Sequence, residues 1–264
     1  MSARPLAIVT GASSGIGEKL AIGYTKRGFD IVIVARRADR LGALEQTLRD
    51  TTDAAVTVVA ADLANDNGVD AVCAALGDRP VDVLVNNAGA GWVGPFSLAP
   101  YERQLEIVDV NCRAVVALTH RVLPRMLARK RGSIVQVASV AGFMPGPLSS
   151  VYYASKAFVV SHSEALRHEL HGSGVTITLV CPGPVDTEFQ RSSGVDSAMG
   201  GAVKMTDVDV AEAAITAAAA GTFLCVPGPE NRLLVSLAAL LPRRVSASLV
   251  ARLQQRRLDG SSGR

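Results

Sequence analysis

Seven short apolar runs, separated by longer segments of helical length, limit the fold of this chain most strongly. The runs are rich in β-branched residues and mostly continuous, which is typical of strands buried on both faces of a parallel sheet. They cover residues 6–9, 31–35, 56–60, 81–85, 133–138, 175–180 and 222–226, and segments of helical length include 15–27, 41–50, 101–129 and 150–172. This order predicts an α/β fold, a doubly wound parallel sheet of about seven strands with helices on both faces.

The composition predicts one globular domain over residues 1–264. With 48% hydrophobic but only 4% aromatic residues, the core should be aliphatic. The net charge of +3 is small for this length and forms no basic stripe, so we expect no binding to nucleic acid. Four dispersed cysteines and four histidines show no ligand spacing, so we expect neither a disulfide framework nor a bound metal.

The apolar run near the N-terminus is too short for a signal peptide, and no window reaches the ~18 apolar residues of a transmembrane helix. Unpaired cysteines suit a reducing compartment, which predicts a cytoplasmic protein. The last residues, 259–264, are rich in Gly and Ser and are expected to form a disordered tail.

The first predicted strand is followed at once by the glycine-rich stretch TGASSGIG, residues 10–17. A helix N-terminus presents unpaired N–H groups to an anion, and glycines let that anion approach the main chain. The spacing Gly-x3-Gly-x-Gly differs from the Gly-x-Gly-x-x-Gly fingerprint, and it lacks the Gly-Lys-Ser/Thr of a P-loop. On its residues alone, the stretch is either a phosphate-binding loop or an ordinary strand–helix turn.

The end of the second predicted strand indicates which nucleotide such a loop would bind. An acidic residue there would bond the ribose of NAD, whereas arginine suits the 2′-phosphate of NADP. The chain has Arg36 and Arg37 at this point and no acid. Because guanidinium groups bind phosphate through paired hydrogen bonds, the arginines favour NADP(H) over NAD(H). The alternative is a solvated pair of arginines.

Four further motifs follow in order along the chain: Asp62-Leu63, Asn86-Asn87-Ala88-Gly89, Ser139, and Tyr152 with Lys156 four residues later. Together with TGASSGIG, they make residues 6–187 resemble the short-chain dehydrogenase/reductase family, in particular its NADP-type carbonyl, 3-oxoacyl and hydroxysteroid reductases. The resemblance implies a Rossmann-type fold and a nicotinamide-dependent oxidoreductase.

The resemblance also implies roles for single positions. The catalytic residues would be Asn111, Ser139, Tyr152 and Lys156. The cofactor would be bound by Gly11, Ser13, Ser14, Gly15, Ile16, Gly17, Arg36, Arg37, Asp62, Leu63, Asn87, Ala88, Gly89, Tyr152, Lys156, Pro182, Gly183, Val185 and Thr187. In this assignment residues 11–17 meet the pyrophosphate and ribose, 62–63 the adenine, and 182–187 the nicotinamide.

The spacing of Tyr152 and Lys156 places both on one face of a helix. We expect the Lys156 ammonium to lower the tyrosine pKa from its usual value near 10, so that the phenol can exchange a proton with a carbonyl or alcohol. Ser139 would donate a hydrogen bond to the same oxygen. Asn111 would hold a helix irregularity and a proton-relaying water. Tyr153 could also reach Lys156, but the family spacing selects Tyr152.

The expected substrate walls are segments 90–96 and 140–148, together with an expected substrate loop over residues 187–206. They are mostly apolar and lack a basic cluster, which favours a lipophilic carbonyl or secondary alcohol as the small-molecule substrate. Their large apolar residues are Trp92, Phe96, Phe143, Met144 and Leu148.

Residues 231–258 are expected to form C-terminal helices. Leucines and a valine recur at helical spacing on both sides of Pro242, and arginines accompany them. Such a face can contact an anionic membrane, cover the substrate cleft or pack against another subunit. The family resemblance makes a homodimer or homotetramer the default.

The sequence as a whole predicts an NADP(H)-dependent oxidoreductase that transfers a hydride between nicotinamide and a carbonyl or secondary alcohol, with Tyr152 as general acid/base. The alternative is a non-catalytic NADP(H)-binding sensor or scaffold protein, because fold alone does not define function. A sensor would not need Asn111, Ser139, Tyr152 and Lys156 in register.

Overall fold

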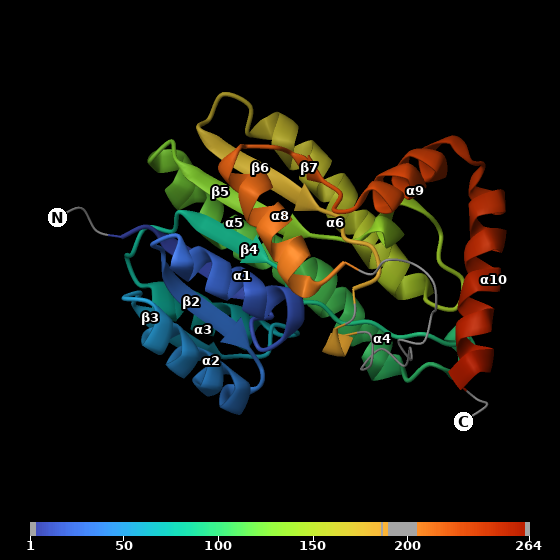
Figure 1. Cartoon of the computed structure of the whole chain (residues 1–264), viewed down its shortest axis with the longest axis horizontal. Coiled ribbons are helices and arrows are strands. Elements are labelled where there is room, and N and C mark those ends of the chain that lie inside the picture. Colours follow the sequence, from blue (N-terminus) through green and yellow to red (C-terminus); the bar gives the residue numbers. More distant parts are fainter. Residues whose placement is uncertain (1–3, 186, 190–204, 262–264) are drawn as a thin grey trace.

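The computed structural model describes residues 4–185, 187–189 and 205–261. Seven parallel strands form one sheet in the order β3-β2-β1-β4-β5-β6-β7 (Figure 1). The strands are β1 (Leu6–Thr10), β2 (Asp30–Ala35), β3 (Val56–Ala60), β4 (Val83–Asn86), β5 (Gly132–Val137), β6 (Val175–Val180) and β7 (Leu224–Cys225). The predicted fold class is confirmed.

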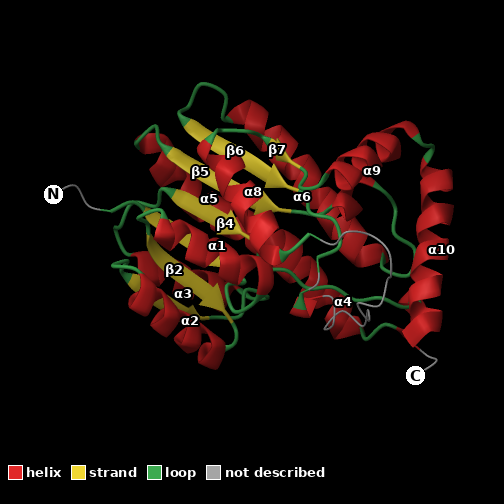
Figure 2. Ribbon diagram, in the orientation of Figure 1, coloured by secondary structure: helices red, strands yellow, loops and turns green. Residues whose placement is uncertain are grey.

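Helices cover both faces of the sheet (Figure 2). One face carries α1 (Gly15–Lys26), α2 (Ala38–Thr51) and α8 (Asp207–Ala219), and the other carries α3 (Asp66–Leu76), α5 (Ala114–Ala128) and α6 (Ser150–Glu169). The remaining elements are η1 (Phe96–Leu98), α4 (Tyr101–Val108), the π-helical turn η2 (Asp109–Arg113), η3 (Val140–Phe143), α9 (Pro229–Leu240) and α10 (Arg243–Ser261).

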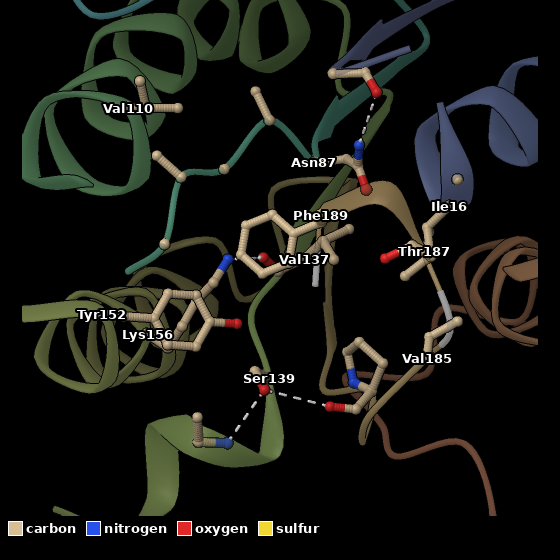
Figure 3. A pocket seen from close by; sticks show the side chains of 18 of the residues that line it. Ile16, Asn87, Val110, Val137, Ser139, Tyr152, Lys156, Val185, Thr187 and Phe189 are labelled. Carbon is tan, nitrogen blue, oxygen red and sulfur yellow. Dashed lines mark hydrogen bonds between the residues drawn. The ribbon is translucent and has the colours of Figure 1, made fainter. Parts of the chain in front are cut away.

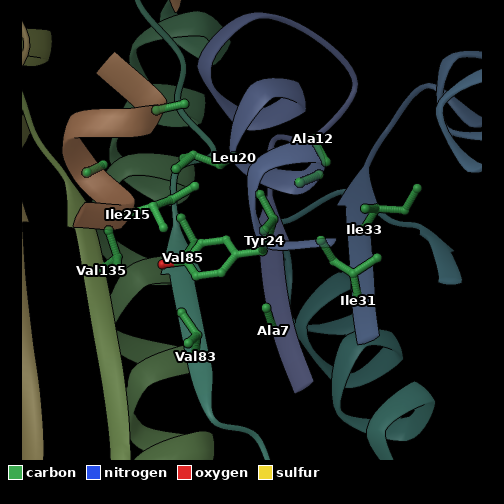
Figure 4. Close-up of a cluster of buried hydrophobic side chains, with 14 of the residues drawn as sticks. Ala7, Ala12, Leu20, Tyr24, Ile31, Ile33, Val83, Val85, Val135 and Ile215 are labelled. Atoms are coloured by element: carbon green, nitrogen blue, oxygen red, sulfur yellow. The ribbon is translucent and has the colours of Figure 1, made fainter. Parts of the chain in front are cut away.

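Two aliphatic layers make up most of the core, one on each face of the sheet. Along β1, Ala7 and Val9 join the layer under α1 and α8, while Leu6 and Ile8 join the opposite layer. Figure 4 shows the first layer, in which Leu20 and Ile215 project onto the sheet. Because every central strand is covered on both sides, its sequence is apolar at successive positions.

The largest departures from the sequence prediction, beyond shifts of a few residues at element ends, are three. The seventh strand is shorter than 222–226, since it lies at the sheet edge and pairs only with β6. The helical stretch 101–129 is interrupted by the π turn η2. Residues 259–261, expected to be disordered, continue α10, because a helix already formed extends cheaply by one residue at a time. Residues 262–264, and 190–204 of the expected substrate loop, lie outside the described part of the chain.

The topology creates a crevice where the strand order reverses. The connections run outward in opposite directions from β1 and β4, which lie side by side. In an open parallel sheet, ligands bind outside the carboxyl ends of the strands at such a switch point. The helices α9 and α10 lie beyond this same edge of the sheet (Figure 1).

Candidate active site

A cavity of about 600 Å³ opens at the carboxyl edge of the sheet. This volume falls in the range of ~300–1,000 Å³ that is usual for ligand pockets. Every predicted site residue except Asn111 lines it: Gly11, Ser13, Ser14, Gly15, Ile16, Gly17, Arg36, Arg37, Asp62, Leu63, Asn87, Ala88, Gly89, Ser139, Tyr152, Lys156, Pro182, Gly183, Val185 and Thr187. The structure thus brings together residues that are up to 176 positions apart in the sequence, from Gly11 to Thr187.

The glycine-rich loop is shaped first by its own packing. Gly11 has φ +68°, and a Cβ there would come within 2.9 Å of the Ala88 backbone. A Cβ at Gly17 would come within 2.2 Å of the Gly11 carbonyl oxygen. Both positions therefore exclude a side chain, and α1 begins directly at the cavity with its N-terminal N–H groups at this edge.

Thr10 and Asn87 join the ends of β1 and β4 beneath the cavity. The Thr10 hydroxyl donates to Val85 O (3.1 Å) and accepts from the backbone N–H groups of Asn87 (2.9 Å) and Ala88 (3.0 Å). The Asn87 amide donates to Thr10 O at 2.8 Å. These bonds explain why polar side chains stand at the ends of two otherwise apolar strands.

Arg37 lies across the glycine-rich loop. Its guanidinium donates to the Ser13 hydroxyl (3.0 Å) and the Ser14 hydroxyl (3.0 Å). Its Nη1 forms an ion pair with Glu188 at 2.8 Å. A strong cation is therefore held at the loop by two hydroxyls, and a carboxylate already neutralises it.

Arg36 points to a different partner. Its Nη1 donates to Glu106 Oε1 of α4 at 2.6 Å, and the other carboxylate oxygen of Glu106 accepts from Arg103. Arg103 also donates to Gly91 O (3.0 Å). Glu106 is mostly buried, so this ion pair fixes Arg36 toward α4, whereas Arg37 stays at the loop.

Lys156 is buried at the wall of the cavity. Its Nζ donates to Val137 O at 3.0 Å and lies 5.8 Å from the centre of the Tyr152 ring. Figure 3 shows the two side chains converging on the cavity from α6. Burial lowers the pKa of Lys156 to about 8, so the ammonium form still predominates at neutral pH.

The pKa of Tyr152 corrects the sequence prediction. Burial raises it to about 12, and the nearby Ser139 hydroxyl offsets this only in part. Lys156 is not among the groups that shift this pKa, and removal of the phenolate from water is the largest cause of the rise. At neutral pH Tyr152 is a phenol and can act as a proton donor.

Ser139 stands at the end of β5, where it begins the turn η3. Its hydroxyl donates to Pro182 O (3.3 Å) and accepts from the Ala141 N–H (3.2 Å). These two contacts hold the hydroxyl at the cavity on the same side as the Tyr152 oxygen (Figure 3). A phenol and a serine hydroxyl therefore face one space.

Asn111 lies behind the cavity wall, within the π turn. Its Oδ1 accepts from the Ala90 N–H (2.8 Å), and its Nδ2 donates to Ala90 O (3.0 Å) and to the Ser155 hydroxyl (2.9 Å). The extra residue of the π turn aims the amide at these partners. Asn111 thus joins the segment after β4 to the helix that carries Tyr152 and Lys156, and the expected helix irregularity is present at this residue.

The apolar wall differs in part from the prediction. Trp92 and Met144 line the cavity. Phe96 does not, since its side chain is 66% exposed, and Phe143 instead packs against the buried cluster around Val159. Leu148 is also absent from the lining, in a tight turn with φ +64°. The spacing of apolar residues in a loop does not reveal which way each one turns.

Several lining residues were not predicted as site residues. Tyr153, Phe189, Leu234, Val250, Leu253 and Gln254 complete the wall, and Glu106 and Glu188 bring carboxylates to it. Leu234 belongs to α9, and Val250, Leu253 and Gln254 belong to α10. These two helices therefore cover the cleft, which is one of the three roles that the sequence left open for them. Charge pairs between distant residues, such as Arg37 and Glu188, leave no local pattern in a sequence.

The cavity at the switch point, with a glycine-rich loop at one end and Tyr152 and Lys156 at the other, is typical of a dinucleotide-binding α/β protein. The sequence profile of the family described as "short chain dehydrogenase" matches residues 5–198. The chain belongs to the short-chain dehydrogenase/reductase family, as its motifs predicted.

One curated relative and two solved structures show the range of similarity. The very-long-chain 3-oxoacyl-CoA reductase of Emericella nidulans is 37% identical over 179 residues, covering 66% of this chain and 52% of that protein. The chain therefore spans about half the length of this relative.

Solved structures match over more of the chain. A short-chain dehydrogenase from Sphingobium yanoikuyae in complex with NADPH is 33% identical, with a TM-score of 0.82 over 89% of this chain and 93% of that one. A short-chain dehydrogenase/reductase from Burkholderia phymatum in complex with NAD is 29% identical, with a TM-score of 0.80 over 89% and 92%. Among the described helices, none has the length and hydropathy needed to cross a membrane.

Proposed function

We propose that the chain is an NADP(H)-dependent carbonyl reductase. The observation that carries this proposal is the convergence of Ser139, Tyr152 and Lys156 on one cavity that begins at a glycine-rich loop. The glycine-rich loop, the start of α1 and Arg37 suit a pyrophosphate and an added phosphate. When bound there, the nicotinamide cofactor would supply the hydride for the carbonyl carbon.

The chain's own groups would manage the proton and the developing charge. Tyr152, a phenol at neutral pH, would give its proton to the carbonyl oxygen, and Ser139 would donate a hydrogen bond to the same atom. Lys156 would favour the phenolate that remains, because its ammonium lies beside the ring. Asn111 would keep these groups in place through Ala90 and Ser155. The reverse steps would serve alcohol oxidation.

The preference for NADP(H) rests on Arg37. Its guanidinium lies on the hydroxyls of Ser13 and Ser14, where a group on the adenosine ribose would arrive. The NADPH bound by the relative from Sphingobium yanoikuyae is consistent with this, whereas the relative from Burkholderia phymatum binds NAD. Arg36, held by Glu106, would play the smaller part.

A lipophilic substrate is supported by the wall of the cavity. Trp92, Val140, Met144, Val250 and Leu253 line the cavity, and the Phe189 ring lies 5.7 Å from the Tyr152 ring. The relative from Emericella nidulans is named for a reaction on very-long-chain 3-oxoacyl groups. A ketone with apolar substituents would bury them against this wall.

We also propose that the protein is cytoplasmic and forms a homodimer or homotetramer. We further propose that it contacts anionic membranes through α9 and α10. The outer faces of these helices expose leucines, among them Leu237 and Leu249, and residues 231–258 carry arginines but no acidic residue. Such a face suits an anionic lipid surface.

The test of the proposed function compares NADPH with NADH as the reductant for wild type and for Arg37→Gln. Apolar ketones, 3-oxoacyl compounds and small charged keto acids would serve as substrates. We expect faster turnover of apolar carbonyls with NADPH, and a loss of the NADPH preference in the variant. Faster turnover of charged keto acids would contradict the lipophilic substrate. Equal use of NADH by wild type would contradict the cofactor preference, and tight NADPH binding without turnover would favour the sensor.

A further inference from the structure

Glu188 forms an ion pair at the point where an added phosphate would be bound. Its Oε1 accepts from Arg37 Nη1 at 2.8 Å, while the same guanidinium donates to Ser13 and Ser14. The hydrogen bond from Arg37 lowers the pKa of Glu188 below its usual value, so the side chain is a carboxylate at neutral pH. The arginine is thus already engaged with an anion supplied by the chain itself.

The same short segment also reaches the other end of the cavity. Phe189, the next residue, places its ring 5.7 Å from the ring of Tyr152 (Figure 3). On the other side of Glu188, Thr187 meets the glycine-rich loop, where a Cβ at Gly15 would come within 3.1 Å of the Thr187 methyl group. Residues 187–189 therefore touch the glycine-rich loop, Arg37 and Tyr152 at once.

We propose that Glu188 reduces the preference for NADP(H) over NAD(H), because its carboxylate competes with the 2′-phosphate for Arg37. The inference rests on the proposed use of NADP(H). A phosphate that binds Arg37 must displace Glu188 or lie beside its negative charge, and either costs binding free energy. A dinucleotide without that phosphate leaves the ion pair intact and avoids the cost. Glu188 thus weakens NADP(H) binding but not NAD(H) binding.

The experiment measures binding by calorimetry, with 2′,5′-ADP and 5′-AMP as the probes. The two fragments differ only in the 2′-phosphate and neither carries nicotinamide, so the result does not depend on turnover. Glu188→Gln removes the charge and keeps the shape of the side chain. Glu212→Gln is the matched control, since Glu212 forms a similar exposed ion pair with Arg27 at 2.6 Å on the outer side of α1 and α8.

For Glu188→Gln we expect 2′,5′-ADP to bind roughly two- to tenfold more tightly, as an exposed ion pair and a like charge are lost. The affinity for 5′-AMP should stay within about twofold, and Glu212→Gln should change neither affinity. Unchanged or weaker binding of 2′,5′-ADP by Glu188→Gln would overturn the inference, the weaker result meaning that Glu188 positions Arg37 for the phosphate.

Arg37→Gln separates this inference from the proposed function. If Arg37→Gln loses the preference of wild type for 2′,5′-ADP while Glu188→Gln changes nothing, only the role of Glu188 fails. If wild type binds 2′,5′-ADP and 5′-AMP equally and Arg37→Gln has no effect, the NADP(H) preference fails and the role of Glu188 with it.

Discussion

Replacement of Lys156 should change how stability depends on pH. In the folded chain burial lowers the pKa of Lys156 from 10.5 to about 8. At about 1.4 kcal/mol per pH unit, burial of this ammonium lowers the free energy of unfolding by about 3 kcal/mol at pH 7. Because the folded pKa is the lower one, the unfolded chain binds the proton more tightly between pH 8 and 10.5. The contribution of Lys156 to the free energy of unfolding therefore rises with pH across this window.

Lys156→Met keeps the aliphatic bulk and removes the titrating group. Urea unfolding of both proteins between pH 7 and pH 10 would give the difference in free energy of unfolding, in which other titrating groups cancel. We expect the free energy of unfolding of wild type, relative to that of the variant, to increase by roughly 2–3 kcal/mol between pH 7 and pH 10. The lost hydrogen bond to Val137 O changes the difference in free energy of unfolding by a constant amount and does not change how that difference depends on pH.

Lys26→Met, at an exposed position at the end of α1, is the control and should run parallel to wild type. Parallel curves for wild type and Lys156→Met would refute the argument, because the ammonium would then cost nothing to bury.

Three further predictions concern the loop, the π turn and the C-terminal helices. Gly17→Ala should lower the melting temperature, since its Cβ would meet the Gly11 carbonyl oxygen at 2.2 Å. Gly42→Ala has open space around it and should raise the free energy of unfolding by about 0.5–1 kcal/mol. Equal melting temperatures for the two variants would contradict this prediction. Asn111→Ala should cost roughly 3 kcal/mol in urea unfolding, because three hydrogen bonds are lost, and a cost below about 1 kcal/mol would mean that the amide is dispensable. Wild type should float with anionic but not with neutral liposomes, and Leu249→Asp should float with neither. If Leu249→Asp still binds anionic liposomes, the exposed face of α10 is not the membrane contact.

Most of the fold could be predicted from the sequence because parallel strands buried on both faces leave continuous apolar runs. The run 175–180, for example, is β6 to the residue. The strand at the sheet edge was predicted less well, because β7 is buried less and pairs on one side only. The end of α10 was missed because glycine and serine lower helix propensity without forbidding a last helical turn.

The candidate site was predictable where short motifs place a residue at the end of a strand, as for Ser139, or on a helix face, as for Tyr152. Its electrostatics were not. The tyrosine pKa depends on how fully the ring is buried, and the partners of Arg36 and Arg37 come from α4 and from the segment after β6. Long-range contacts of this kind require the fold.

The most direct test of the central claim follows the loss of NADPH absorbance with an apolar ketone that wild type reduces, for wild type and for Tyr152→Phe. The phenylalanine ring fills the same space but has no proton to give. We predict that the variant still binds NADPH and turns over at least ~100-fold more slowly, the lower bound for a lost general acid. Turnover by Tyr152→Phe within a few-fold of wild type would contradict the account, because the proton would then come from another group.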